Sequence, residues 1–429
     1  MISAFGAMLI AFAILTIIGF PLAFAMLLSC AFYFMLSGQP LYLVAQHFFN
    51  GIDIFTIMAI PFFMLAGDLM VVSGTAERLL KFAQLLVGRL RGGTGYVNIV
   101  ASMLFGGCSG SSVADIAALG RMQVSMMERS GFSREFAAAL TIATSIKGAI
   151  IPPSIPIVLV GAVTGTSIGG MLIGGLVPGL LVALAMAVTV FFYTRKRVVA
   201  QMEPTSARQK AVIVFQSLPF LMMPVIILGG ILSGVFTPTE ASAAAVGWGL
   251  ILWIDSSRGR PDLRVLGSVF VRSGTLAAAV LLLTGASNVF SWVLAAERVP
   301  AMIADGISSI TTDPILVLLI INIFLLIWGL FMDMLPAIFI VVPILVPLAT
   351  KLGIDPVHFG VVCTFNLVIG LITPPYGTAL FTGSIVLNMP IEKIVRHMIP
   401  FFIAAIAVLL LITYVPETVL FLPRMMGLL

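Results

Sequence analysis

The sequence predicts an all-α polytopic membrane protein made of two inverted repeats. Hydrophobic residues make up 60% of its 429 residues, and charged residues only 9%. Apolar stretches long enough to cross a bilayer as helices recur along the whole chain. The second half also repeats landmarks of the first half at a constant spacing. The mean hydropathy of +1.19 argues against a soluble enzyme of this length.

Long apolar stretches are predicted as membrane spans. They cover residues 4–20, 22–37, 54–73, 133–165, 167–194, 211–233, 236–255, 274–294, 356–386 and 398–421. Two further stretches, 97–127 and 314–349, are interrupted at mid-length by polar residues, glycine or proline. We expect these two to be re-entrant hairpins that enter the membrane and return on the same side.

The basic residues support this arrangement. Nearly all of the 22 lysines and arginines then lie on one side of the membrane, including the runs at 194–210 and 258–272. The exceptions are Arg298, Lys351 and Arg424 on the other side, and Lys147 within a span. An excess of basic residues marks the cytoplasmic side, so both termini are predicted to lie outside the cytoplasm.

The two halves repeat at an offset of 222 residues without gaps. The matches are Gly107 with Gly329, Gly131 with Gly353, Gly148 with Gly370, Pro152-Pro153 with Pro374-Pro375, Gly161 with Gly383 and Pro178 with Pro400. We assign residues 1–195 and 211–429 to the two repeats and 196–210 to a cytoplasmic linker. Each repeat has an odd number of crossings, so the two lie upside down relative to each other. This architecture is typical of secondary transporters, whose site lies near the midplane.

Each half contains a polar hairpin tip followed by a span with a double proline. The tips read GGCSGSSVAD (106–115) and GLFMDMLPA (329–337), and the spans contain IIPPS (150–154) and ITPPY (372–376). A proline pair removes two backbone donors and ends a helix. Both spans should therefore unwind within the membrane, where free carbonyl groups survive only if they line a cavity or are buried in protein.

Free carbonyls, hydroxyls and a carboxylate form a site of oxygen atoms suited to coupling by Na⁺ or H⁺. The N-termini of half-helices at the same breaks favour an anionic substrate. We therefore predict two ion sites with the substrate between the tips. The first site comprises Ser109, Ser111, Ser112, Asp115, Pro152 and Ser154. The second comprises Asp333, Thr373, Gly377 and Thr378.

Residues around these sites are candidates for substrate contacts. They are Gly110, Thr144, Ser145, Lys147, Asn366, Pro375 and Tyr376. Lys147 has two interpretations, as a substrate anchor or as the structural partner of a nearby carboxylate. Small residues in membrane helices often serve only close packing. Here the cluster recurs beside a double proline in both halves, which favours ion binding. Asp68 and its repeat counterpart Asn288 are predicted to be structural.

Other function classes fit the sequence less well. The CSGSS motif superficially resembles the surroundings of a serine nucleophile, but no base is placed to activate Ser109 or Ser111. No phosphate-binding loop for ATP is present. Paired hairpins suit an alternating site better than an open channel. We expect no enzyme activity, no cofactor beyond a coupling ion and no nucleic-acid partner. The amphipathic stretch 76–88 is expected to lie along the membrane surface.

The motifs that carry this interpretation resemble the large membrane subunit of TRAP transporters, the tripartite ATP-independent periplasmic carriers. The resemblance includes GGCSGSSVADIAALG (106–120) with IPPS (151–154), GLITPPYGTALF (370–381) and GVFTPTEASAAAVGWGL (234–250). It extends over the whole chain. It implies an elevator mechanism, in which the hairpins and broken helices form a transport domain that slides against a scaffold of the remaining spans.

The resemblance also implies Na⁺ coupling, a small four-span membrane subunit and a periplasmic binding protein that delivers the substrate. It implies a multi-pass protein of the bacterial inner membrane with periplasmic termini. The substrates of the family are carboxylates, of which we favour sialic acid over a C4-dicarboxylate. By the same resemblance, GVFTPTEA (234–241) would belong to the contact surfaces of the scaffold, which leaves Glu240 as an unproven candidate for a site. An alternative keeps the fold without the partners, as a stand-alone ion-coupled dicarboxylate carrier or antiporter.

Overall fold

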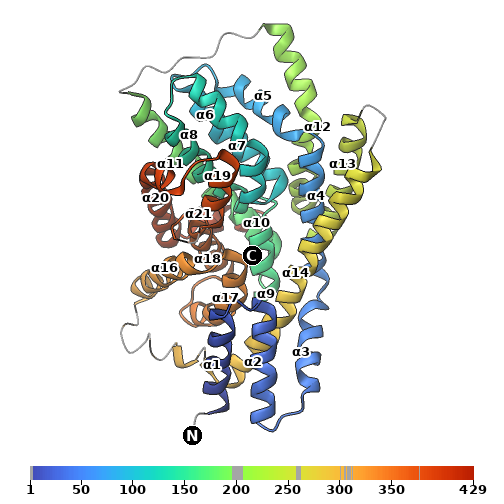
Figure 1. Ribbon diagram of the computed structural model, residues 1–429, viewed down its shortest axis with the longest axis vertical. Coiled ribbons are helices and arrows are strands. Elements are labelled where there is room, and N and C mark those ends of the chain that lie inside the picture. The colour runs from blue at the N-terminus through green and yellow to red at the C-terminus, as the bar shows by residue number, and fades with distance from the viewer. Residues whose placement is uncertain are drawn as a thin grey trace.

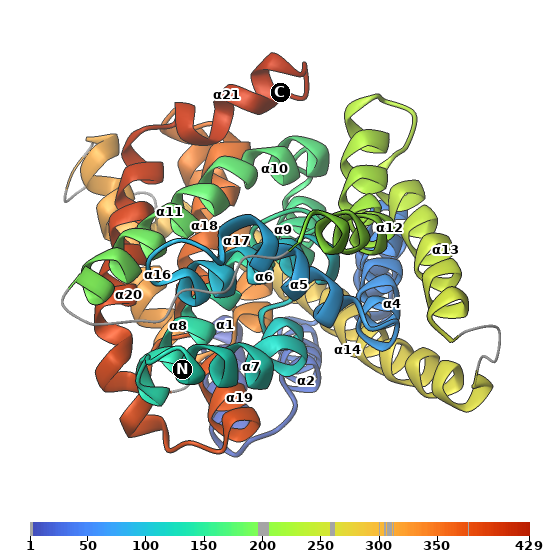
Figure 2. The same cartoon turned by 90° about the horizontal axis from the view of Figure 1, so that it is seen from above.

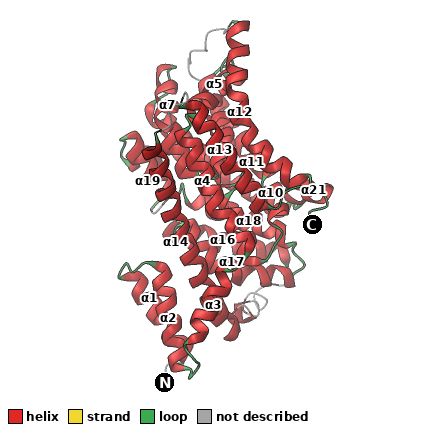
Figure 3. Cartoon of the chain, turned by 90° about the vertical axis from the view of Figure 1, so that its right-hand side faces the viewer, coloured by secondary structure: helices red, strands yellow, loops and turns green. Residues whose placement is uncertain are grey.

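The computed structural model describes residues 3–195, 206–257, 262–299, 301–303, 306, 311, 313–375 and 377–429. Regular structure in these ranges is entirely helical (Figure 3). Residues 196–205 of the predicted linker lie outside them, as does the predicted substrate contact Tyr376. Seven helical segments in the described ranges are long and apolar enough to cross a membrane. The prediction of an all-α membrane protein is therefore confirmed.

The first half of the chain begins at the lower end of the molecule in Figure 1 and rises to the upper end. Its α-helices are α1 (Ala4–Ile17), α2 (Leu22–Leu36), α3 (Tyr42–Ile52), α4 (Ala59–Val72), α5 (Thr75–Val87), α6 (Gly93–Ser109), α7 (Ser112–Arg129), α8 (Arg134–Ser145), α9 (Ile155–Thr164), α10 (Ile168–Gly174) and α11 (Leu176–Arg195). The short turns η1 (Phe55–Met58) and η2 (Ile146–Ala149) are 3₁₀-helical. The amphipathic stretch predicted at 76–88 forms α5.

In the second half, α16 to α19 follow the order of α6 to α9, whereas the elements before and after them differ. Its helices are α12 (Ala207–Leu232), α13 (Pro238–Ser256), α14 (Leu263–Ala296), α16 (Pro314–Phe331), α17 (Met334–Lys351), α18 (Pro356–Gly370), α19 (Thr378–Leu387), α20 (Ile391–Tyr414) and α21 (Glu417–Met425). The helix that contains the predicted span 274–294 is longer than expected, because α14 already begins at Leu263. The predicted span 398–421 is divided into α20 and α21, with Pro416 between them.

Each stretch predicted as a hairpin forms two consecutive helices, and each span predicted to break is interrupted. The stretch 97–127 forms α6 and α7, and 314–349 forms α16 and α17. The stretch 133–165 is interrupted between Ala149 and Ile155, and 356–386 between Gly370 and Thr378. The double prolines lie in these interruptions and have cis peptide bonds.

The arms of each hairpin pack on the following broken helix through glycines. A Cβ atom on Gly106 of α6 would lie 2.6 Å from the Cα atom of Gly148. In the second half, a Cβ atom on Gly370 would lie 2.9 Å from the carbonyl oxygen of Gly329. The glycines recognised in the repeat therefore permit close backbone contact, with Gly106 rather than Gly107 facing Gly148.

The two halves also interlock. Helix α7, the second helix of the first hairpin, packs on α19. Helix α17, the second helix of the second hairpin, packs on α9. Each hairpin therefore contacts the broken helix of the other half. Arg121 Nε donates to the Val386 carbonyl at 2.8 Å, and Arg134 Nη2 donates to Leu387 at 3.0 Å. Guanidinium groups at the C-terminus of α19 satisfy carbonyls that have no partner within the helix.

A second group of helices lies beside this interlocked part. Helix α4 packs against α13 and α14, and α14 also packs against α2 and α3. Seen from above, α4, α12, α13 and α14 lie together on the right, away from α11 and α20 (Figure 2). Gly67 of α4 reaches the first tip, because a Cβ atom there would lie 3.0 Å from the Ser109 carbonyl oxygen.

We expect Gly106→Ala to destabilise the protein by about 1–3 kcal/mol, since the added methyl group overlaps backbone atoms that cannot rotate away. Thermal unfolding of the purified protein in detergent measures this change. Gly247→Ala is the matched control, because a Cβ atom on this helical glycine meets nothing within 4 Å. Equal melting temperatures for the two variants would contradict the close contact.

Candidate functional site

The first hairpin turns tightly at Gly110. This residue has a φ angle of 64°, in the left-handed region, and a Cβ atom on it would lie 2.6 Å from the Pro153 carbonyl oxygen. Ser111 then caps α7, its Oγ accepting from the Ala114 amide at 3.4 Å. Glycine is required here because the φ angle is positive and because a side chain would overlap the Pro153 carbonyl oxygen. The turn places the tip directly against the first double-proline break.

Three buried oxygen atoms at this tip have no partner. Of the six buried side-chain atoms that lack a hydrogen bond within the described ranges, three are Ser109 Oγ, Ser112 Oγ and Asp115 Oδ1. Ser112 and Asp115 are three residues apart in the first turn of α7, and therefore share a face. The other carboxylate oxygen of Asp115 accepts a hydrogen bond from Ser102. Because unpaired buried oxygens are costly, this cluster is suited to receive a cation or a proton.

The first break supplies backbone carbonyls next to the cluster. The Pro153 oxygen faces Gly110, and the Pro152 oxygen would lie 3.6 Å from a Cβ atom on Gly107. The Ser154 side chain has a capping role, since its Oγ donates to the Ala149 carbonyl at 2.6 Å and accepts from the Ile157 amide at 3.2 Å. The Ser154 hydroxyl therefore restores hydrogen bonds at the interruption.

The second tip has a similar place but different chemistry. Asp333 precedes α17, and its Oδ1 accepts from Thr378 Oγ1 at 3.0 Å. Thr373 Oγ1 donates to the Ile369 carbonyl at 2.8 Å, and the Gly377 amide donates to the Thr373 carbonyl at 3.0 Å. Asp333 is half-buried, and Pro375 is exposed. The carboxylate and the threonine predicted for the second site are thus in contact.

A cavity of about 330 Å³ separates the two tips. Six of the predicted site residues line it: Ser109, Gly110, Ser111, Ser112, Asp333 and Thr378. Helix α4 contributes Met64, Gly67 and Asp68, and α14 contributes Arg272, Leu276 and Val280. Elements far apart in sequence therefore meet around one space, which Ser109 and Ser112 line. Asp115 of the first tip is not part of the lining.

Lys147 lies outside this lining. Its side chain is fully buried, and Nζ donates to the Ile99 carbonyl of α6 at 2.9 Å. No nitrogen–oxygen pair of Lys147 and Asp115 lies within 4.0 Å. The position of Lys147 speaks against direct contact with a substrate in the cavity.

Thr144, Ser145 and Asn366 also lie away from the cavity. Thr144 Oγ1 donates to Asn98 Oδ1 at 3.0 Å, and Ser145 Oγ donates to the Ile142 carbonyl at 2.7 Å. Asn366 Nδ2 donates to Asn322 Oδ1 at 2.9 Å. Thr144 and Asn366 thus join each broken helix to the first arm of its own hairpin, at positions that the repeat makes equivalent.

Two charged residues that line the cavity, Asp68 and Arg272, are not predicted as site residues from the sequence. Asp68 is predicted to be structural, and its Oδ2 does accept from Ser273 Oγ at 2.7 Å, but it also lines the cavity. Arg272 is assigned to the cytoplasmic basic residues and excluded from the span at 274–294. A single arginine within an apolar run that continues on both sides is the signal that identifies it.

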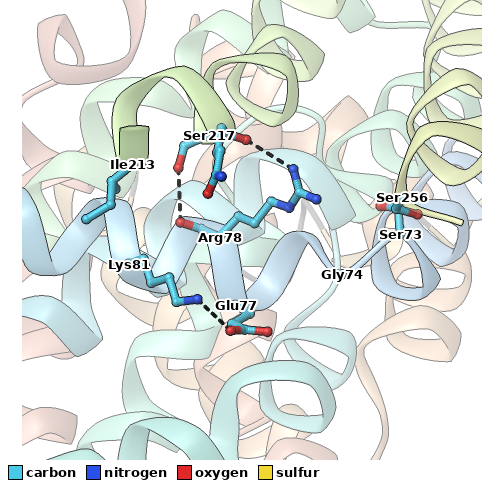
Figure 4. A pocket seen from close by; sticks show the side chains of 9 residues that line it. Ser73, Gly74, Glu77, Arg78, Lys81, Ile213, Ser217 and Ser256 are labelled. Carbon is cyan, nitrogen blue, oxygen red and sulfur yellow. Dashed lines mark hydrogen bonds and ion pairs between the residues drawn. The ribbon is translucent and has the colours of Figure 1, made fainter. Parts of the chain in front are cut away.

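A second hollow of about 420 Å³ lies where α5 meets α12 (Figure 4). Ser217 Oγ donates to the Arg78 carbonyl at 3.2 Å, and the Arg78 guanidinium lies 4.8 Å from the centre of the Phe220 ring. The hydrogen bond from Lys81 to Glu77 lowers the pKa of that carboxyl. Among the described residues that line it, no buried side-chain atom lacks a partner. We interpret the contacts around this hollow as structural, because they hold α5 against α12.

Glu240 also has a structural role. Its Oε2 accepts from the Thr237 amide at 2.8 Å, which completes a capping box at the start of α13. A capping box satisfies two amides that a helix start leaves free.

Comparisons with known proteins identify the family of this chain. A family model described as "Tripartite ATP-independent periplasmic transporter, DctM component" matches residues 9–418. The uncharacterized protein YgiK of Salmonella typhimurium is 41% identical over 418 residues, which cover 96% of each chain. The sialic acid TRAP transporter large permease SiaM of Vibrio cholerae is 38% identical over 410 residues, with 95% of each chain covered.

The C4-dicarboxylate TRAP transporter large permease DctM of Pseudomonas aeruginosa is 37% identical over 386 residues, 90% of each chain. Among solved structures, the YdaH transporter of Alcanivorax borkumensis has a TM-score of 0.57 at 14% identity and covers 82% of this chain and 84% of that one. The similarity to the YdaH structure supports the fold assignment. The chain therefore belongs to the DctM component family of the tripartite ATP-independent periplasmic transporters, which are transporters and not enzymes.

Proposed function

We propose that this large permease takes up a carboxylate by secondary active transport coupled to Na⁺. The observation that carries the proposal is the set of buried oxygens without partners on Ser109, Ser112 and Asp115. Ser109 and Ser112 line the cavity, and Asp115 lies one helical turn beyond Ser112. Hydroxyl, carboxylate and carbonyl oxygens are ligands for hard cations. Coupling by protons is the alternative, in which Asp115 would carry the proton.

The substrate is proposed to be an anion held between the two tips. Two relatives are named for sialic acid and for C4-dicarboxylate, and both substrates are carboxylates. We favour sialic acid, with a C4-dicarboxylate as the next candidate. The starts of α7 and α9 lie beside this cavity, through Ser112 and Ile155, and helix N-termini favour negative charge.

The movement is proposed to be that of an elevator. In this scheme the hairpins and broken helices form the moving transport domain, and the scaffold comprises the remaining spans. The interlocking of α7 with α19 and of α17 with α9 supports a single moving body. Helices α4 and α14 also line the cavity, as expected for a scaffold.

We infer that the protein works with a small four-span subunit and a periplasmic binding protein in the inner membrane, with both termini periplasmic. The tripartite description of the family supports these partners. The rival is a stand-alone ion-coupled carrier of the same fold, such as a dicarboxylate carrier or an antiporter.

Uptake into proteoliposomes tests the proposal directly. We expect labelled sialic acid or succinate to accumulate only with an inward Na⁺ gradient, the small subunit and the binding protein present. The label that accumulates identifies the substrate. Uptake by this chain alone, or uptake driven by a proton gradient without Na⁺, would support the rival carrier instead.

Asp115→Asn should raise the Na⁺ concentration for half-maximal uptake by about tenfold or more, because the charge that attracts the cation is lost. Uptake is measured as a function of Na⁺ at saturating substrate. Asp255→Asn is the control, because this carboxylate is exposed at the end of α13. An unchanged Na⁺ dependence in Asp115→Asn would remove this carboxylate from the ion site.

Val113→Cys provides a test of alternating access. Val113 is 40% exposed and lines the cavity, whereas the native cysteines at positions 30, 108 and 363 are buried. We expect an impermeant maleimide to label this cysteine from either side of the membrane, with less labelling when Na⁺ and substrate are bound. Val235→Cys, outside the cavity, should not respond to substrate. Labelling of Val113→Cys from one side only under all conditions would argue against the elevator.

A further inference from the structure

Of the charged residues that line the cavity, the two aspartates have hydrogen-bond partners and the arginine has none among the residues that the structure describes. Asp68 accepts a hydrogen bond from Ser273 at 2.7 Å, and Asp333 accepts one from Thr378 at 3.0 Å. Arg272 is the one cationic residue in the described lining of the cavity. Its guanidinium has no hydrogen bond or ion pair with any residue that the structure describes, although Asp68 lines the same space.

The position of Arg272 on α14 directs it to the cavity. Arg272, Leu276 and Val280 all line this space and are spaced at intervals of four residues. Residues four apart occupy one face of a helix, so these three define the face that α14 turns to the tips. Arg264 lies on the same helix about two turns earlier and does not line the cavity.

A guanidinium in this place matches the chemistry of a carboxylate. Arginine presents its donors in a planar fork that can bind both oxygens of a carboxylate at once. Asp68 and Asp333 each accept a hydrogen bond from a hydroxyl group, and neither forms an ion pair with Arg272. The arginine donors therefore remain for an incoming anion.

We propose that Arg272 binds the carboxylate of the transported molecule and determines the preference for anions. This inference rests on the proposed function, and adds to it a contact from the scaffold side of the cavity. Because α14 belongs to the proposed scaffold, the contact exists only while the tips lie opposite Arg272. Movement of the transport domain would break it, so Arg272 contributes to substrate affinity in one conformation.

Direct binding to the purified complex of this chain with its small subunit tests the inference. The probes are labelled sialic acid and succinate, each compared with its uncharged amide, at saturating Na⁺ and without binding protein. We expect Arg272→Gln to raise the Kd for the carboxylates by about tenfold, with little change for the amides. Arg272→Lys should give an intermediate value, because lysine keeps the charge and loses the fork.

Controls separate this role from others. Arg264→Gln should bind both probes as the wild type does, and the Na⁺ concentration for half-maximal binding should be unchanged in Arg272→Gln. Equal losses for carboxylate and amide, with a lower melting temperature, would show a structural role and overturn the inference. Wild-type affinity in Arg272→Gln, with Na⁺-dependent uptake intact, would overturn this inference alone. A wild-type protein that binds neither carboxylate would overturn the proposed function and this inference with it.

Discussion

The fold requires hydrogen-bond partners for the backbone groups that become free where helices are interrupted between apolar segments. A backbone break in such surroundings is tolerated only when the protein itself supplies partners. At the first break the Ser154 hydroxyl bonds on both sides of the gap, to Ala149 and Ile157. Glycine contacts bring the hairpin arms against the breaks in both halves. Of the five buried side-chain oxygens that lack a partner in the described ranges, three lie at the first tip.

The two tips share a position but not a chemistry. The first combines a deeply buried carboxylate with hydroxyls that have no partner in the described ranges. The second has a half-buried carboxylate that is already bonded to Thr378. The two tips are therefore unequal candidates for an ion site. An ion at the first tip would replace missing contacts, whereas an ion at the second would compete with an existing hydrogen bond.

Much of the fold could be predicted from the sequence, because proline pairs and glycines act locally. The hairpins, the breaks and the residues at both tips follow from these motifs alone. Arg272 could not be assigned in this way, since counting basic residues treats every arginine near a span end alike. Its place depends on the start of α14 at Leu263, which Asp262 caps by accepting from the Arg264 amide at 2.9 Å. The partners of Thr144 and Asn366 depend on helix packing between distant segments, which one sequence does not reveal.

The interlocking of the two halves has a consequence for biosynthesis. Helix α7 leaves the ribosome long before α19, whose Val386 and Leu387 would touch a Cβ atom on Gly120 at 3.6 Å. Until α19 arrives, the face of α7 that it covers has no permanent neighbour, and Arg121 lacks the carbonyl that it binds. The first hairpin must therefore wait in an incomplete state, or against the insertion machinery, while the second half is made. Neither half can reach its final packing on its own, although the two share one plan.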